Sequence, residues 1–501
     1  MIARKITLYF TSKIFNTFIS FLALIIVARE MGSIPIGIIG YSTGIIGMFS
    51  LIAGLGFTTT HRKKVSEGGD LAMCIGTYSV IKLSLILIWV TIFFLWVSYS
   101  KFLKRDFIFE SEAEIVLYIV ALYTIIFQLT DIFTATFIAK GEMAKSTIPE
   151  VYSRLFTAFS KILVSFTGMT VVYLAAGQLF GYVLLFFLLL WFFRDYSVKF
   201  PDYAHLKSYF TFTLPLFLMV MMAVLTVNLD RVMIGYYWGF SEVSFYTVPS
   251  KFSQSLLLIS TSISTVIFPK LSKKNAEGDI PYIRKMVPLM EKYILLILTP
   301  IVVFVLVYSE IITITLLGNE FLPSAILFKY LTVVSYIAAI TRPYITQIVS
   351  MGRVNLSFLI GCSIFLPHIL LNFIFIPEYL FEYKMLGMGA EGAAIATLIG
   401  TIFGLLLSRF FSYQTLGIKQ RYNTFLSYFF SATIMAALMV ISKILFDINH
   451  FIPAFFLTAI SSIFYLLSLM VFNQIGRKEI DMILTAFNPF AMKKYIVDEI
   501  K

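Results

Sequence analysis

Charged side chains are scarce in this sequence, and their scarcity excludes an ordinary soluble protein. They make up 13% of the 501 residues, whereas hydrophobic residues make up 59%. A soluble globular domain carries about 25% charged residues. Apolar runs of about 20 residues, each long enough to cross a hydrocarbon core roughly 30 Å thick, recur along the whole chain. We therefore expect a polytopic membrane protein.

Cysteine and histidine are also rare. The two cysteines, Cys74 and Cys362, fall in or near expected helices, and nothing in their placement suggests a disulfide. The histidines are dispersed without the spacing of metal ligands, and they are His61, His205, His368 and His450. We expect neither a metal site nor a bound cofactor.

Motifs for catalysis are missing as well. The chain has no lysine in a Gly-rich phosphate-binding loop and no G-x-S-x-G. No connector exceeds about 20 residues, whereas membrane polymerases and glycosyltransferases of this size usually carry a large outer loop. These absences favour a protein that is not an enzyme and does not hydrolyse ATP by itself.

The apolar runs predict an all-α fold with fourteen spans. Their approximate bounds are 8–28, 34–57, 75–99, 115–138, 151–171, 173–193, 212–235, 243–268, 287–308, 323–348, 355–376, 388–410, 424–446 and 451–473. The first run lacks a cleavage signal and further spans follow it, so we interpret it as a retained helix. An even number of spans places both termini on one side.

The net charge of +12 does not indicate nucleic acid, because the basic residues gather on alternate connectors. On the side of the termini they include Lys63, Lys64, Lys273, Lys274, Arg409, Lys419 and Arg421. The opposite connectors carry only Arg29, Lys101, Lys104, Arg105 and Lys384. The positive-inside rule predicts cytoplasmic termini in a plasma or inner membrane.

An internal repeat links the two halves. Residues 63–68 read KKVSEG and residues 273–278 read KKNAEG, a separation of 210, while Gly32 and Gly239 precede the matching spans at a separation of 207. Six spans per repeat is an even number, so both halves share one orientation. We expect an N-lobe at 1–200, a C-lobe at 207–418, and two further spans with an amphipathic cytoplasmic tail at 419–501.

Polar residues inside the first six spans form a stripe. In the fifth span, four of them share one helical face: Arg154, Thr157, Lys161 and Ser165. In the fourth span, three could face this stripe: Thr124, Gln128 and Asp131. Arg154 also lies close enough to the cytoplasmic end to reach lipid phosphates, and Asp131 could form a structural ion pair with Lys161 or Arg154.

Charged residues also lie inside later spans, where charge is costly and usually functional. Asp230 and Arg231 are adjacent in the seventh span, although they could equally hold helices together. The candidate anion ligands are Arg154, Lys161, Arg231, Lys251 and Arg342, and the candidate ion-coupling or structural acids are Asp131 and Asp230. This basic excess suits a lipid pyrophosphate. We expect Asp230 or Arg231 to face a cavity between the lobes while the other pairs with a neighbouring helix.

Several stretches resemble one family, the Wzx-like polysaccharide flippases of the MOP (multidrug/oligosaccharidyl-lipid/polysaccharide) exporter superfamily. The matching segments are 32–41, 54–57, 214–215, 230–235, 243–246, 268–273 and 389–397. The resemblance covers nearly the whole chain, and it implies a MATE/MOP-like pair of six-helix lobes arranged as a V. The drug exporters and lipid II flippases of this superfamily share much of the pattern.

What the resemblance implies is transport by alternating access. The substrate would be an undecaprenyl-pyrophosphate-linked oligosaccharide that moves from the cytoplasmic to the outer leaflet for O-antigen or capsule synthesis. Asp230 and Arg231 match a family signature, and the two last spans could form a groove for the polyprenyl tail. The implied partners are membrane lipid and the polymerase and glycosyltransferases of the pathway, with the chain acting as a monomer.

Two other functions compete with this hypothesis. A cation-coupled exporter of drugs or small molecules would need acidic rather than basic residues to dominate its cavity. A membrane polysaccharide polymerase would need a large outer loop, which the connectors do not supply.

Overall fold

The computed structural model describes residues 2–103, 111–419 and 422–476, and this part of the chain is almost entirely helical. The expected tail at 477–501 lies outside the described residues, as do Lys104, Arg105 and Arg421. The chain forms two compact units, one running to Ser244 and the other beginning at Phe245. The lobe boundaries expected from the sequence remain a prediction.

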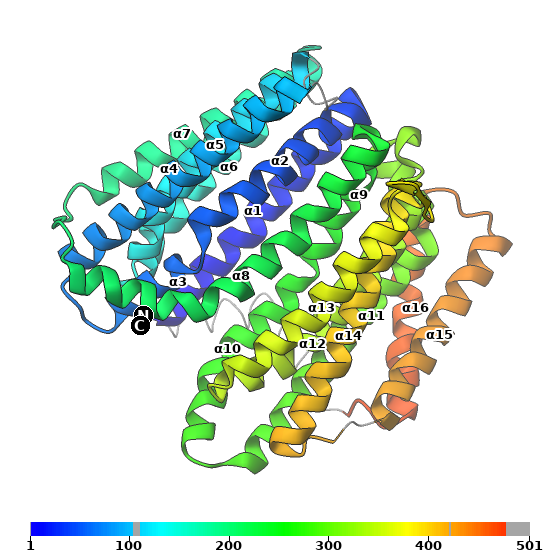
Figure 1. Ribbon diagram of the computed structural model, residues 1–501. Helices are drawn as coiled ribbons and strands as arrows, with labels where there is room; N and C mark the ends of the chain where they lie inside the picture. The colour runs from blue at the N-terminus through cyan, green and yellow to red at the C-terminus, as the bar shows by residue number, and fades with distance from the viewer. Residues whose placement is uncertain (1, 104–110, 420–421, 477–501) are drawn as a thin grey trace. The chain divides into compact units, whose positions relative to one another are not determined.

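The first unit is a helical bundle. Its helices are α1 (Ile2–Met31), α2 (Ser33–Gly54), α3 (Phe57–Ser66), α4 (Leu71–Leu103), α5 (Ser111–Ala139), α6 (Met143–Phe166), α7 (Val171–Phe193) and α8 (Tyr203–Trp238). Helix α6 packs against α1 and α7, and α2 packs against α4, α5 and α8 (Figure 1). Asp202 begins α8 by accepting a hydrogen bond from the backbone N–H of His205 at 2.7 Å, as a helix N-cap does.

Glycines let α2 and α8 approach closely. Gly37, Gly44 and Gly47 follow each other at helical spacing along α2, and a Cβ on Gly44 would lie 3.2 Å from the Cβ of Arg231. Gly235 of α8 lies against the ring of Tyr41. A Cβ added to Gly235 would lie 2.0 Å from the nearest ring atom of Tyr41. Since lipid is as apolar as these helices, such close packing stabilises their association where the hydrophobic effect cannot.

A break in the backbone separates α2 from α3. Leu55 has φ 25° and Gly56 has φ 84°, the left-handed region that glycine tolerates and leucine rarely adopts. The break ends the long helix and gives α3 a direction of its own. Arg62 is carried by this short helix.

The second unit contains the remaining helices. Its elements are α10 (Leu257–Ala276), α11 (Ile280–Leu317), the 3₁₀ helix η2 (Asn319–Phe321), α12 (Ser324–Ser350), α13 (Val354–Phe375), α14 (Gly389–Leu416), α15 (Tyr422–Leu445) and α16 (Phe451–Val471). Helix α9 (Phe240–Ser255) begins in the first unit and ends in the second. Strands β1 (Tyr379–Leu380) and β2 (Tyr383–Lys384) form a small antiparallel hairpin in which Tyr379 pairs with Lys384.

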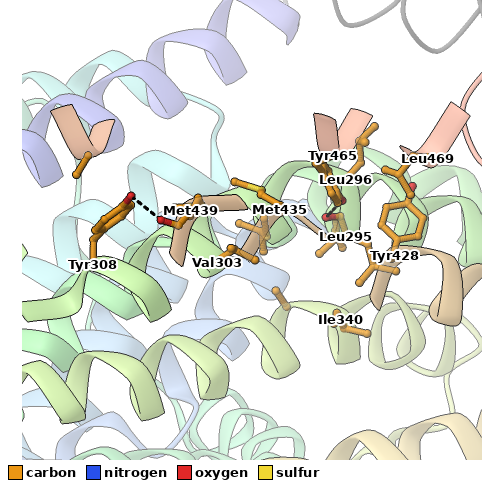
Figure 2. Packing of buried hydrophobic residues seen from close by; sticks show 14 of the residues in the cluster. Leu295, Leu296, Val303, Tyr308, Ile340, Tyr428, Met435, Met439, Tyr465 and Leu469 are labelled. Carbon is orange, nitrogen blue, oxygen red and sulfur yellow. Dashed lines mark hydrogen bonds between the residues drawn. The ribbon is translucent and has the colours of Figure 1, made fainter. Parts of the chain in front are cut away.

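The core of the second unit joins α11 and α12 to the last two helices. Buried residues of all four helices pack together, among them Leu295, Ile340, Met435 and Leu469 (Figure 2). Tyr308 donates a hydrogen bond from its hydroxyl to the carbonyl of Met439 at 3.3 Å, across α11 and α15. The two helices outside the internal repeat are therefore built into the core of this unit.

Twelve helical stretches among the described residues are long and apolar enough to cross a membrane. Helices α6 and α8, which cover the fifth and seventh expected spans, are not among the twelve. The structure thus agrees with a helical, multi-pass membrane protein, and the count of fourteen stays a prediction.

The two repeated sequences share their local backbone structure. Glu67 N–H donates to the carbonyl of Lys63 at 2.9 Å, and 210 residues later Glu277 N–H donates to that of Lys273 at 3.0 Å. The glycine that ends each motif has positive φ, 85° at Gly68 and 73° at Gly278. Both motifs therefore end a helix in the same way, as a left-handed glycine commonly does.

Candidate functional site

The first unit contains a charged cavity of about 260 Å³. Helices α1, α3, α5, α6 and α7 each contribute to its wall. The lining residues are Lys13, Arg62, Phe127, Thr130, Asp131, Thr134, Ile138, Ser146, Glu150, Ser153, Arg154, Tyr182 and Leu185. Three of these side chains are basic and two are acidic.

One ion pair in the wall joins α1 to α6. The Nζ of Lys13 lies 2.7 Å and 2.8 Å from the two carboxylate oxygens of Glu150. Both side chains are partly exposed, at 35% and 26%. The charge of Glu150 is therefore offset within the wall itself.

A second ion pair joins an acid of the cavity wall to a buried lysine that does not line the cavity. Asp131 accepts a hydrogen bond from Nζ of Lys82 at 3.0 Å, and the same ammonium donates to the carbonyl of Ala53 at 3.1 Å. The Lys82 side chain is 1% exposed, whereas that of Asp131 is 28% exposed and lines the cavity. The structural partner of Asp131 is thus a lysine of α4, in place of the Lys161 or Arg154 considered from the sequence.

Arg62 and Arg154 are the two remaining charges. Among the described residues, neither guanidinium forms an ion pair with a carboxylate. Arg154 lies 6.0 Å from the centre of the Tyr182 ring, a distance at which cation–π attraction is modest. Because both acids of the wall have basic partners, these two arginines give the cavity its excess positive charge.

A cavity of this kind favours an anion. Guanidinium groups bind phosphate through charge-assisted hydrogen bonds in a fork geometry that lysine lacks. Hydroxyl groups of Thr130, Thr134, Ser146 and Ser153 add polar contacts to the same wall. The site can therefore hold a phosphorylated group next to a neutral polar one.

Other residues of the predicted stripe have different neighbours. Lys161 donates to Oε1 of Gln178 at 2.6 Å, which links α6 to α7, and it does not line this cavity. Gln128 bonds Trp89 of α4 and the carbonyl of Ser50 in α2, each at 3.0 Å. The expected facing of Gln128 toward the fifth span is therefore wrong, because its amide is used against α2 and α4.

Asp230 and Arg231 are both buried, at 2% and 8% exposure. They lie on α8, where that helix packs against α2. A position facing lipid is thereby excluded for both side chains. Whether either one faces a cavity between the lobes stays a prediction.

The charged residues predicted for the second unit lie on its surface. Lys251 of α9 and Arg342 of α12 are exposed. His368 and Asn372 are fully buried and contact each other at 3.1 Å within α13. This unit also has a hollow of about 620 Å³ between α11 and α15, where Lys443, Asp447 and Asn449 adjoin apolar side chains.

Sequence reasoning missed a partly buried charged group in the second unit. Arg409 of α14 forms an ion pair with Glu291 of α11, and Tyr344 of α12 donates its hydroxyl to the other oxygen of that carboxylate. The sequence analysis placed Arg409 in a connector, but α14 continues to Leu416, so Arg409 lies within the helix. In the first unit, Lys82 was missed although a lysine within an apolar run was a visible signal.

Comparison with known proteins identifies the family. Residues 26–326 match the model of the family described as polysaccharide biosynthesis protein. A Haloferax volcanii protein, named "Probable low-salt glycan biosynthesis flippase Agl15", is 21% identical over 467 residues, which cover 91% of this chain and 92% of that protein.

Solved structures show the same fold at low identity. The lipid II flippase MurJ in an inward closed conformation matches with a TM-score of 0.74 and 18% identity over 95% of this chain and 99% of that one. An inward-facing multidrug resistance MATE transporter of the MOP superfamily matches with a TM-score of 0.60 and 14% identity over 80% and 94%. The family resemblance seen in the sequence motifs is confirmed: this chain belongs to the polysaccharide biosynthesis protein family.

Proposed function

We propose that this protein moves an undecaprenyl-pyrophosphate-linked oligosaccharide from the cytoplasmic to the outer leaflet of the cell membrane, for the synthesis of a surface polysaccharide. Family membership and the name of the Haloferax relative support a flippase of glycan biosynthesis. The fold shared with the lipid II flippase agrees with a lipid-linked substrate.

The observation that carries the proposal is the pair of arginines in the first unit. Arg62 and Arg154 line one cavity, and the acids beside them are already paired with Lys82 and Lys13. A pyrophosphate carries negative charge on several oxygens, which two guanidinium groups neutralise without disturbing either ion pair. The hydroxyl-bearing wall suits the first sugar.

The other basic residues predicted from the sequence would act at later stages. Lys161, Arg231, Lys251 and Arg342 would meet the substrate as an N-lobe at 1–200 and a C-lobe at 207–418 alternate access. Asp131 and Asp230 would then be structural or ion-coupling acids. We further propose fourteen spans, cytoplasmic termini, a monomeric transporter, and a polyprenyl tail held by the last two helices.

Alternating access would lower the free-energy cost of moving this substrate across the membrane. A charged pyrophosphate and a hydrated glycan cannot cross hydrocarbon without a large desolvation penalty. A cavity that offers cations and hydroxyls replaces part of that hydration, so the protein need only expose the cavity to one side at a time. The lipid tail can remain in the bilayer throughout.

The proposal is tested in cells that depend on this chain for a surface polysaccharide. The double variant Arg62→Gln/Arg154→Gln should reduce surface polysaccharide at least tenfold, and lipid-linked oligosaccharide should accumulate where a membrane-impermeant glycosidase cannot reach it. Lys207→Gln, which changes an exposed lysine of α8 away from the cavity, should match the wild type. Normal outer-leaflet exposure of the glycan in the double variant, at equal protein abundance, would refute the proposal.

The second candidate is a cation-coupled exporter of drugs, which the MATE likeness of the fold favours. Excess positive charge in the cavity disfavours a cationic drug. If the double arginine variant instead retained glycan export and lost resistance to a cationic dye, this second function would replace the first.

A further inference from the structure

The Arg62 side chain is exposed, so packing around it does not fix its position. It lies on α3, the shortest helix of the first unit. What places its guanidinium in the cavity is the position of α3. That helix is separated from α2 by the left-handed residues Leu55 and Gly56, so its direction is not fixed by the long helix before it. Contacts made by the other faces of α3 must fix it.

Helix α3 packs against α5 and α4, and it also contacts the beginning of α8 (Figure 1). Thr60 shares a hydrogen bond of 2.7 Å with the hydroxyl of Thr213, and both side chains are buried. One turn earlier, Phe57 meets the ring of Phe210 edge-on at 5.1 Å. The ammonium of Lys63 lies 3.9 Å from the centre of the Phe212 ring.

His61 makes the most extensive connection. Its imidazole is fully buried, with Nε2 2.9 Å from Oγ1 of Thr136 in α5 and Nδ1 3.1 Å from the hydroxyl of Tyr209 in α8. The Tyr78 ring of α4 stacks on it at 4.5 Å. Three helices therefore meet at one side chain next to Arg62.

The hydrogen-bond directions of this group are consistent with one neutral tautomer. Thr136 donates its hydroxyl proton to the carbonyl of Ile132 at 2.8 Å, so it accepts from His61 Nε2–H. Nδ1 is then the acceptor, and it shares the single hydroxyl proton of Tyr209 with the carbonyl of Cys74, which lies 3.3 Å from that hydroxyl. Loss of the Tyr209 hydroxyl would leave a buried acceptor without its donor, which is more costly than the net value of the bond.

We propose that Thr60 and His61 are positioning residues that hold the Arg62 guanidinium in the anion cavity and tie its position to α8. The inference rests on the proposed function for the role of Arg62, while the mechanical tie stands on the contacts of α3. When the first half of α8 moves, α3 moves with it and Arg62 is withdrawn or presented. Substrate affinity is thereby coupled to the conformation of α8.

The first experiment measures the affinity of the purified full-length protein for inorganic pyrophosphate. The double variant Tyr209→Phe/Thr213→Val removes both hydroxyl links from the α8 side and leaves α3 unchanged. Its Kd should rise about three- to tenfold, and the same pair of substitutions should have no further effect on an Arg62→Gln background. Tyr308→Phe, another buried tyrosine whose hydroxyl bonds a backbone carbonyl, should leave the Kd unchanged.

The second experiment follows α3 directly. Arg62→Cys is introduced after Cys74→Ala and Cys362→Ala, and the rate of its labelling by a charged maleimide is measured. Tyr209→Phe/Thr213→Val should change that rate at least threefold, because a released α3 presents position 62 differently. Should the double variant fail to fold, either single substitution carries both measurements.

The outcomes separate the two proposals. If pyrophosphate does not bind the wild type, or binds Arg62→Gln equally well, the proposed substrate site is refuted. The labelling rate still tests whether α3 is held by its contacts with α8. Equal loss of affinity on both backgrounds, or an unchanged labelling rate, would overturn the positioning role of Thr60 and His61.

Discussion

Lys82 and Asp131 form an ion pair of 3.0 Å between α4 and α5, with the lysine 1% exposed and the aspartate open to the cavity. The pair has two effects. It fixes two helices of the first unit through a buried charge, and it offsets the aspartate beside Arg62 and Arg154, which form no ion pair with a carboxylate in the part of the chain that the structure describes. A cavity that would otherwise repel phosphate at one point is therefore able to accept it.

Breaking this pair from the lysine side should be strongly destabilising. Lys82→Met leaves the Asp131 carboxylate without its buried cation, and removal of one partner of a buried pair costs about 3–5 kcal/mol. The thermal unfolding midpoint in detergent should fall accordingly. Adding Asp131→Asn should recover much of the loss, and a double variant no more stable than Lys82→Met would show that the pair is not the cause.

The contact of α2 with the segment after α8 predicts intolerance of a single methyl group. A Cβ on Gly37 would lie 1.8 Å from the carbonyl oxygen of Phe240, so Gly37→Ala must displace backbone. Overpacking of this kind costs about 1–3 kcal/mol or more, and folded yield by size-exclusion chromatography should drop. Gly361→Ala in α13, where no atom lies within 4 Å of the added Cβ, should be neutral or slightly stabilising.

The carboxylate of Glu142, in the connector after α5, predicts a loss of stability in acid. Burial raises the pKa of Glu142, but hydrogen bonds from Lys145, Tyr196 and Lys140 outweigh it and lower the pKa to about 2. A depressed pKa stabilises the folded state above the ordinary value near 4.5, and this contribution is lost as the pH falls from there toward 2.

Glu142→Gln removes that contribution at every pH. The variant should be about 1–3 kcal/mol less stable than the wild type at pH 7, and the difference should shrink as the pH is lowered from 5 toward 3. Thermal unfolding in detergent at several pH values measures both. A difference that does not vary with pH would assign the effect to packing rather than to charge.

The partly buried group formed by Arg409, Glu291 and Tyr344 gives a graded series of stability losses. Arg409→Met leaves Glu291 with only the Tyr344 hydroxyl, and we expect a loss of about 3–5 kcal/mol. Tyr344→Phe removes one hydrogen bond and should cost about 1–2 kcal/mol. A double-mutant cycle in detergent measures their coupling, and strict additivity would show that the three side chains do not act as one group.

The sequence by itself determined the class of the molecule. Long apolar runs require helices in a bilayer, because hydrocarbon leaves no partner for an unpaired backbone group. The motifs around Gly32, Asp230 and Gly389 identified the family, and the KKVSEG and KKNAEG segments predicted an internal repeat. Each of these properties depends on residues close together in the chain.

Only the tertiary structure decided which charges meet. Arg154 lines a cavity inside the first unit, and Lys13 and Arg62 reach the same cavity from α1 and α3, which no local pattern relates to α6. Lys82 pairs with an aspartate 49 residues away, and Arg409 with a glutamate 118 residues away. Helical spacing assigns a side chain to a face of its own helix, whereas the neighbour of that face is set by how the helices pack.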